Sequence, residues 1–203
     1  VLITRKEFAL TNYFLPGFWP HAALYVGQEA ELQGSRVADD FMFLSWLPAF
    51  RECGPAEEGR VLEALKDGVR LRGVSTPLSC DAVALVRPKL TSGEIGSALA
   101  RGFHFVGRPY DFDFDFSCSH RMVCTEVVYR AYDGVGGVKF ELPRHLGRYA
   151  LAAAVILVSM RLTMLAPERP LPKEEAPPLD WAPILRLIAM AAIFTAISVG
   201  RLL

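Results

Sequence analysis

The sequence predicts an α+β domain, rich in β-strands with a few helices. Three observations support this class: short apolar runs with many β-branched and aromatic residues, an aspartate-glycine pair between two such runs, and segments whose apolar residues recur at helical spacing. At 203 residues the chain is long enough for one compact domain and an appendage. A single catalytic or binding unit is therefore expected.

Most of the expected strands lie in the first half of the chain. They are VLITR (1–5), HAALYVG (21–27), VLEAL (61–65), VRLRGV (69–74) and DAVALVRP (81–88). Asp67-Gly68 joins the third and fourth runs, and such a pair is a strong hairpin signal. FMFLSWLPAF at 41–50 predicts a helix or a covering loop.

Two helices are expected in the second half. Residues 91–107 predict the first, because Thr91 or Ser92 can cap it, Glu94 falls in its first turn and Gly102 can close it. MVCTEVVYRAY at 122–132 predicts the second, with apolar residues at helical spacing. Between them, RPYDFDFDF at 108–116 alternates like a strand.

The composition changes after residue 148, where we expect the catalytic domain (1–148) to end. The apolar run 149–165 predicts a core helix, and the proline-rich, charged residues 166–182 predict a linker. Residues 183–203 contain about fourteen uninterrupted uncharged residues between two arginines and are a candidate transmembrane helix. A buried or interfacial helix is the alternative. The expected location is membrane-associated, on an unknown side.

Charge and cysteine content exclude several classes of function. Lysines and arginines number 22, as do aspartates and glutamates, so no overall charge favours nucleic acid. The four cysteines show no CxxC spacing, which argues against a zinc ribbon or a thioredoxin motif. No cofactor is expected.

Cys124 is the strongest candidate for chemistry. It lies at the start of a predicted helix, where the helix dipole and free amides favour a thiolate and can stabilise an oxyanion. The alternative is a buried apolar residue. His21 opens an apolar strand and is either a base or a hydrogen-bonded core residue; Glu63 interrupts VLEAL and either faces solvent or turns inward to hold an imidazole. His104, His120 and His145 are competing bases.

WPHAALYVG, VLEALKDGV, GRPYDFDFDF and MVCTEVVYRAY, in this order, resemble the YaeF/YiiX-type permuted papain-like amidases, relatives of NlpC-type peptidases and of lecithin:retinol acyltransferase. The resemblance implies a circularly permuted papain-like domain, with an antiparallel sheet and packed helices. It also implies Cys124 as nucleophile, His21 as base and Glu63 as its orienting partner. Thr125 stands where serine is commoner in that group.

The resemblance places further residues near the site. Trp19, Tyr110, Asp111 and Thr125 are expected around the substrate pocket. Alternation places Asp111, Asp113 and Asp115 on one strand face, which is either a solvated face or a cation site, and no metal is expected.

The expected function is cysteine-dependent hydrolysis of an amide or peptide-like bond through an acyl-enzyme. One alternative is acyl transfer or lipid hydrolysis by the same residues. Others are a membrane-anchored binding protein without turnover and a protease of ubiquitin-like modifiers. The expected partners are a peptide or lipid substrate with an amide or ester bond, and a membrane.

Overall fold

The computed structural model describes residues 1–7, 9 and 18–142 and, beyond them, 144–145, 148–149, 151–153, 155–156, 160 and 163–165. The chain divides into a unit Val1–Ala166 and a unit Pro167–Leu203, and only the first contains described residues. The predicted linker and candidate transmembrane helix therefore lie outside the described residues and stay predictions. In the described part, no helix is long and apolar enough to cross a membrane.

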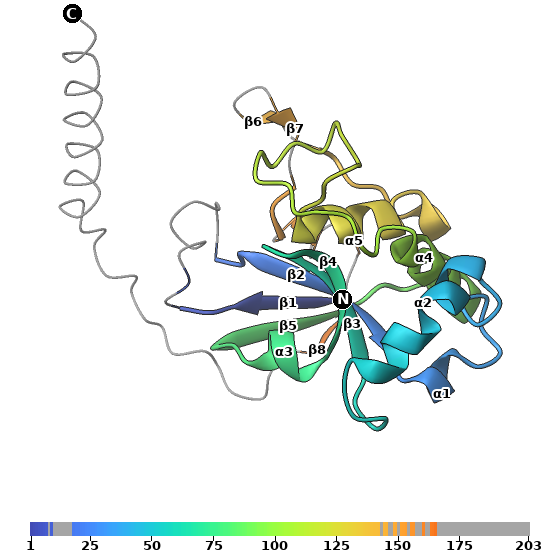
Figure 1. The fold of residues 1–203 in the computed structure, drawn as a ribbon. Coiled ribbons are helices and arrows are strands. Elements are labelled where there is room, and N and C mark those ends of the chain that lie inside the picture. Colours follow the sequence, from blue (N-terminus) through green and yellow to red (C-terminus); the bar gives the residue numbers. More distant parts are fainter. Residues whose placement is uncertain are drawn as a thin grey trace, which may run out of the picture. The chain divides into compact units, whose positions relative to one another are not determined.

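A six-stranded antiparallel sheet forms the centre of the first unit (Figure 1). Its order is β4-β3-β2-β1-β5-β8. The strands are β1 (Leu2–Arg5), β2 (His21–Gly27), β3 (Arg60–Leu65), β4 (Gly68–Gly73), β5 (Ala82–Arg87) and β8 (Thr163–Leu165). β6 (Arg144–His145) and β7 (Arg148–Tyr149) form a separate pair. The five strands predicted in the first half of the chain are all present as β1 to β5.

The hairpin β3–β4 follows its aspartate-glycine turn. Leu65 pairs with Gly68 at the turn, and Gly68 has a φ of +91°, which a side chain would strain. The register continues to Glu63 opposite Arg70 and Val61 opposite Arg72. Because side chains alternate between the two faces, Glu63, Arg70 and Arg72 share one face of the hairpin.

The longer helices pack on one face of the sheet: α2 (Phe41–Glu52), α4 (Ser92–Phe103) and α5 (Cys124–Tyr132). The shorter helical segments are α1 (Glu29–Leu32), α3 (Ser75–Leu78), which contacts β1, and the 3₁₀ turn η2 (Val135–Gly137). Ala22, Leu24 and Leu62 point from the sheet into the core beneath the longer helices. A Cβ at Gly102 would lie 2.7 Å from Leu24 Cδ2. Gly102 thus lets α4 approach the sheet, and the predicted helix end at Gly102 was wrong, since His104 is the C-cap.

Two other predictions differ from the structure. Residues 108–116 are not a strand: Tyr110 makes a single bridge to Met122, and the following segment is a series of turns. Residues 149–165 are not one helix, because 163–165 pair with β5 while 153, 155 and 156 are helical. The compact unit accordingly extends to Ala166, past the expected end at 148.

Candidate active site

Cys124 is the first residue of α5. The helix buries Val127, Val128 and Ala131 in the core between it and the sheet, which fixes its position on the sheet face. Its N-cap is Val123, whose side chain makes no capping hydrogen bond. By contrast, α4 is capped by Thr91 and Glu94 in a reciprocal pair. The N-terminal amides of α5 are therefore left to interact with something other than a capping side chain.

His21 is the first residue of β2 and pairs with Thr4 of β1. It follows the buried Pro20, which has no N–H to extend the ladder, so the strand starts at the histidine. The imidazole keeps 20% of its surface exposed. It is thus held by the sheet but remains accessible to a substrate.

Glu63 is turned inward, with 1% of its side chain exposed. The pairing of Leu24 with Leu62 places Glu63 opposite Ala23 and diagonal to His21 on the same face. Its Oε2 lies 2.7 Å from His21 Nε2. Because Nε2 faces the carboxylate, Nδ1 is the ring nitrogen left for the thiol. The sequence left two orientations open for Glu63, toward solvent or inward toward an imidazole, and the structure shows the inward one.

The structure brings Cys124 and His21 into hydrogen-bond contact. Burial disfavours the charged form of each, but their mutual attraction outweighs it: the pKa of His21 is raised, with Glu63 contributing, and the pKa of Cys124 is lowered. The backbone amides of Ala22 and Thr125 also hydrogen-bond to the Cys124 sulfur and lower its pKa further. This geometry favours a thiolate-imidazolium pair in the resting protein.

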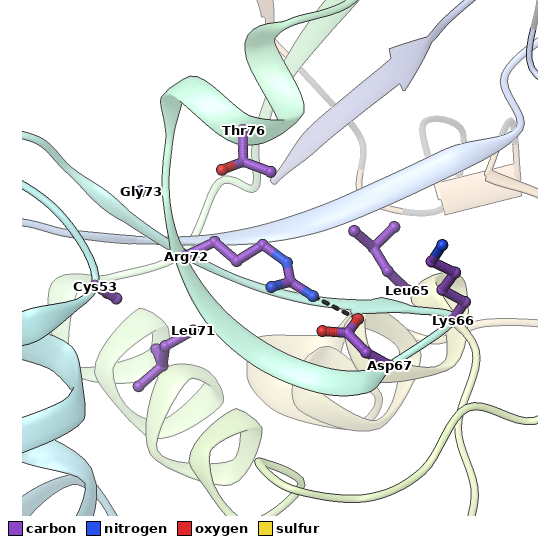
Figure 2. Close-up of a pocket in the computed structure, with 8 residues that line it drawn as sticks. All are labelled: Cys53, Leu65, Lys66, Asp67, Leu71, Arg72, Gly73 and Thr76. Carbon is purple, nitrogen blue, oxygen red and sulfur yellow. Dashed lines mark hydrogen bonds and ion pairs between the residues drawn. The ribbon is translucent and has the colours of Figure 1, made fainter.

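Arg72 is a residue that the sequence analysis did not single out. Its Nε lies 3.1 Å from Glu63 Oε1, and its Nη2 donates a hydrogen bond of 2.7 Å to Asp67 Oδ1. Figure 2 shows Arg72 reaching along the hairpin toward Asp67. The hairpin register alone places Arg72 diagonal to Glu63, so this pairing could have been found from the sequence.

A cavity of about 530 Å³ adjoins this arginine (Figure 2). It is lined by Cys53, Leu65, Lys66, Asp67, Leu71, Arg72, Gly73 and Thr76. The cavity therefore adjoins Arg72, and neither His21 nor Cys124 faces it.

The four residues expected at the substrate pocket differ in their surroundings. Burial, followed by the negative charges of Cys124 and Asp111, raises the pKa of the Tyr110 phenol. Thr125 is buried, and its amide contacts the Cys124 sulfur. Trp19 is half-buried, two residues before His21, and its ring packs edge-on against Phe18 at 4.9 Å.

The aspartate-rich segment is held together by its own backbone. Asp111 is buried, and its carboxylate accepts the amide protons of Asp113 at 3.1 Å and Asp115 at 2.8 Å. Arg121 donates to Asp113 at 3.0 Å. Within the described ranges, no group of three or more histidine, cysteine, aspartate or glutamate side chains is arranged to hold a metal ion. The three aspartates therefore do not share a strand face, and Asp111 organises a turn.

A second missed residue is Glu126, two positions after Cys124 on α5. Its side chain is fully buried, and Oε1 accepts a 2.6 Å hydrogen bond from Arg130 Nε. Arg130 also donates to the carbonyl of Phe116 at 2.8 Å, which fastens the aspartate-rich segment to the helix. Burial raises the pKa of Glu126 to about 7 despite Arg130. Glu126 and Arg130 are four residues apart in a predicted helix, and this spacing could have indicated their ion pair from the sequence.

Two of the three competing histidines, His104 and His120, are exposed side chains. His104 is the residue that ends α4, and Nδ1 of His120 lies 3.0 Å from Cys118 Sγ. The side chain of His145 lies outside the described residues.

A search among curated proteins gave no match. The crystal structure of the metalloprotein yiiX from Escherichia coli O157:H7 is similar over 57% of this chain and 79% of that chain, at 18% identity and a TM-score of 0.49. Residues 1–168 match the family described as permuted papain-like amidase enzymes, YaeF/YiiX, C92 family. Since this match spans most of the sequence, the chain belongs to the permuted papain-like amidase family.

Proposed function

We propose that this protein is a cysteine hydrolase that cleaves amide or peptide-like bonds through an acyl-enzyme on Cys124. The observation that carries the proposal is the contact of the Cys124 thiol with His21, whose other nitrogen lies 2.7 Å from the buried Glu63. Membership of an amidase family supports a reaction of the hydrolase type. Thiol, base and orienting carboxylate are the three parts that covalent acyl transfer requires.

In the proposed first step, the Cys124 thiolate attacks the substrate carbonyl carbon, and the carbonyl oxygen takes the negative charge. The backbone N–H of Cys124 precedes the first intrahelical bonds of α5, which Glu126 and Val127 donate to Val123, and can donate to this oxyanion. His21 then gives its proton to the leaving nitrogen as the carbon–nitrogen bond breaks. The products of this step are a thioester and a free amine.

In the second step, neutral His21 takes a proton from water, and the resulting hydroxide attacks the thioester carbonyl. The carbon–sulfur bond breaks, the acid is released, and the proton on His21 restores the thiolate-imidazolium pair. Glu63 keeps the ring oriented and stabilises its positive form in both steps.

The first test is alkylation of the protein with iodoacetamide across pH, located by mass spectrometry. We expect Cys124 to react with an apparent pKa below the usual ~8.5 of a free thiol, and more slowly in His21→Ala. Cys53 and Cys80 are internal controls, because burial raises the pKa of both thiols. Cys124 labelling no faster than these two would overturn the catalytic proposal and favour a binding protein without turnover.

A second candidate is cleavage or transfer of a fatty acyl group by the same residues. It is favoured by two exposed aromatic side chains on the segments that lead to His21 and to α5: Phe18, 49% exposed and packed on Trp19, and Phe112, 69% exposed and packed edge-on against Tyr110 at 5.0 Å. Exposed aromatic side chains can bind the apolar hydrocarbon of a fatty acyl group. Mass spectrometry of products from peptide amides and from phospholipid esters distinguishes the two candidates.

A further inference from the structure

Arg72 is the described cation that contacts the Glu63 end of the site. The guanidinium Nε lies 3.1 Å from Glu63 Oε1, while Oε2 of the same carboxylate faces His21. Glu63 is almost completely buried, so its charge has little water to stabilise it. An ion pair on one oxygen therefore restricts how the carboxylate can turn and balances its charge.

Arg72 is itself anchored. Its Nη2 donates to Asp67 Oδ1 at 2.7 Å, and Asp67 lies in the turn of the same hairpin (Figure 2). A guanidinium has a planar fork of donors, which allows it to face two carboxylates at once in a fixed geometry. The series Asp67, Arg72, Glu63, His21 and Cys124 thus runs from the hairpin turn to the thiol.

The net charge of the four members from Arg72 to Cys124 affects how easily the thiol loses its proton; Asp67 is left out of this sum because its side chain is 52% exposed to water. With the thiolate, the imidazolium, the Glu63 carboxylate and the Arg72 guanidinium present, the buried group has no net charge. Without Arg72, the same group carries one net negative charge. Because buried net charge is unfavourable, the thiol would then keep its proton to higher pH.

We propose that Arg72 is a positioning residue of the active site, which holds Glu63 toward His21 and balances the charge that the Cys124 thiolate brings. The inference rests on the proposed function of Cys124, His21 and Glu63. It adds a fourth side chain that acts on the thiol only through the other two.

Arg70 offers a matched control on the same hairpin. It is directly opposite Glu63 in the register, carries the same charge and is exposed. No ion pair joins it to Glu63 among the described contacts, where Arg72 is the arginine facing that carboxylate. Removing either arginine changes the net charge of the protein equally. A difference between the two variants in thiol reactivity therefore depends on where the arginine lies relative to Glu63.

The experiment compares the pH dependence of Cys124 alkylation in wild type, Arg72→Gln, Arg72→Lys and Arg70→Gln. We expect the Arg72→Gln midpoint to rise by about one pH unit or more, Arg72→Lys to rise less because the charge remains, and Arg70→Gln to match wild type. Circular dichroism checks that each variant is folded. A purely structural role for Arg72 would lower the unfolding midpoint without moving the alkylation midpoint.

The alkylation midpoints of the variants decide between the possible roles of Arg72. An Arg72→Gln midpoint that coincides with that of Arg70→Gln overturns the inference. If Arg72→Gln does not fold, Arg72→Lys decides alone: a raised midpoint supports the positioning role, and a wild-type midpoint contradicts it. Failure of the proposed function is distinct, since it appears in the wild type as Cys124 labelling no faster than Cys53 or Cys80.

Discussion

At the scale of single residues, the proposed chemistry depends on charges that are removed from water in pairs. Glu63 is the clearest case: with 1% of its side chain exposed, it contacts an imidazole through one oxygen and a guanidinium through the other. The sequence could name Glu63 only as a residue that either faces solvent or turns inward. The choice depends on what the other strands place beside it, which local composition does not encode.

Replacing the charge of Glu63 should weaken the thiolate. In Glu63→Gln, the amide can still hydrogen-bond to His21 but no longer stabilises the imidazolium, so the pKa of His21 falls and that of Cys124 rises. We expect iodoacetamide to label Cys124 about tenfold more slowly near pH 6, since one unit of pKa is a factor of ten. Glu57→Gln, at an exposed glutamate, is the control. Equal rates in both variants would exclude an electrostatic role for Glu63.

Glu126 should make stability depend on pH. Its folded-state pKa of about 7 lies above the ordinary value of 4.5, so between these values the folded protein binds more protons than the unfolded chain. Stability from this group is therefore full below about 4.5 and is lost as pH rises through about 7, by roughly 1 kcal/mol per unit. The charged neighbours are Arg130 and Asp111. Urea unfolding at several pH values should show this loss in wild type and not in Glu126→Gln.

At the scale of elements, local signals were reliable where both partners lie close in sequence. Thr91, one of the two predicted caps, begins α4 and forms a reciprocal pair with Glu94, and the predicted aspartate-glycine pair makes the β3–β4 turn. The alternation over 108–116 misled because Asp111 folds back onto the amides of Asp113 and Asp115. An aspartate side chain that binds amides two and four residues on stabilises a turn, although the same spacing also fits a strand.

Two glycines of α4 allow a matched test of helix packing. A Cβ at Gly102 would lie 2.7 Å from Leu24 Cδ2, whereas a Cβ at Gly93 would have nothing within 4 Å. We expect Gly102→Ala to destabilise the protein by about 1–3 kcal/mol through overpacking. Gly93→Ala should be neutral or stabilise it by up to about 1 kcal/mol, because alanine is the better helix former. Thermal unfolding measures both, and equal effects would show that α4 does not need this close approach.

At the scale of the whole molecule, the compact unit extends to Ala166, past the change of composition at residue 148. The apolar residues after 148 looked like one helix, but β8 pairs with β5 and so adds a sixth strand from the far end of the unit. Leu151, Ile156 and Met160 are buried in the same core as α4 and α5. Long-range pairing of this kind leaves no periodic signal, so the sequence could not distinguish it from a core helix.

Truncation tests this boundary. A chain of residues 1–166 should fold and keep a reactive Cys124, because it contains every described strand and helix. A chain of residues 1–148 loses β8 and the buried side chains of Leu151, Ile156 and Met160, among others, each of these three worth about 1.5–3 kcal/mol. That loss is comparable with the ~5–15 kcal/mol stability of a typical domain. Circular dichroism and iodoacetamide labelling of the two chains should therefore differ sharply, and two equally folded chains would contradict the later boundary.

The chain order of the site also has a consequence for biosynthesis. His21 and Glu63 lie on β2 and β3, whereas Cys124 begins a helix that follows them by some sixty residues or more. A ribosome makes the imidazole and the carboxylate first, and domains fold as units while synthesis continues. In the proposed mechanism, the thiol lacks its activating partners until α5 packs against the finished strands. We therefore expect an ordinary cysteine in a nascent or misfolded chain, and a reactive thiolate only in molecules that have completed their fold.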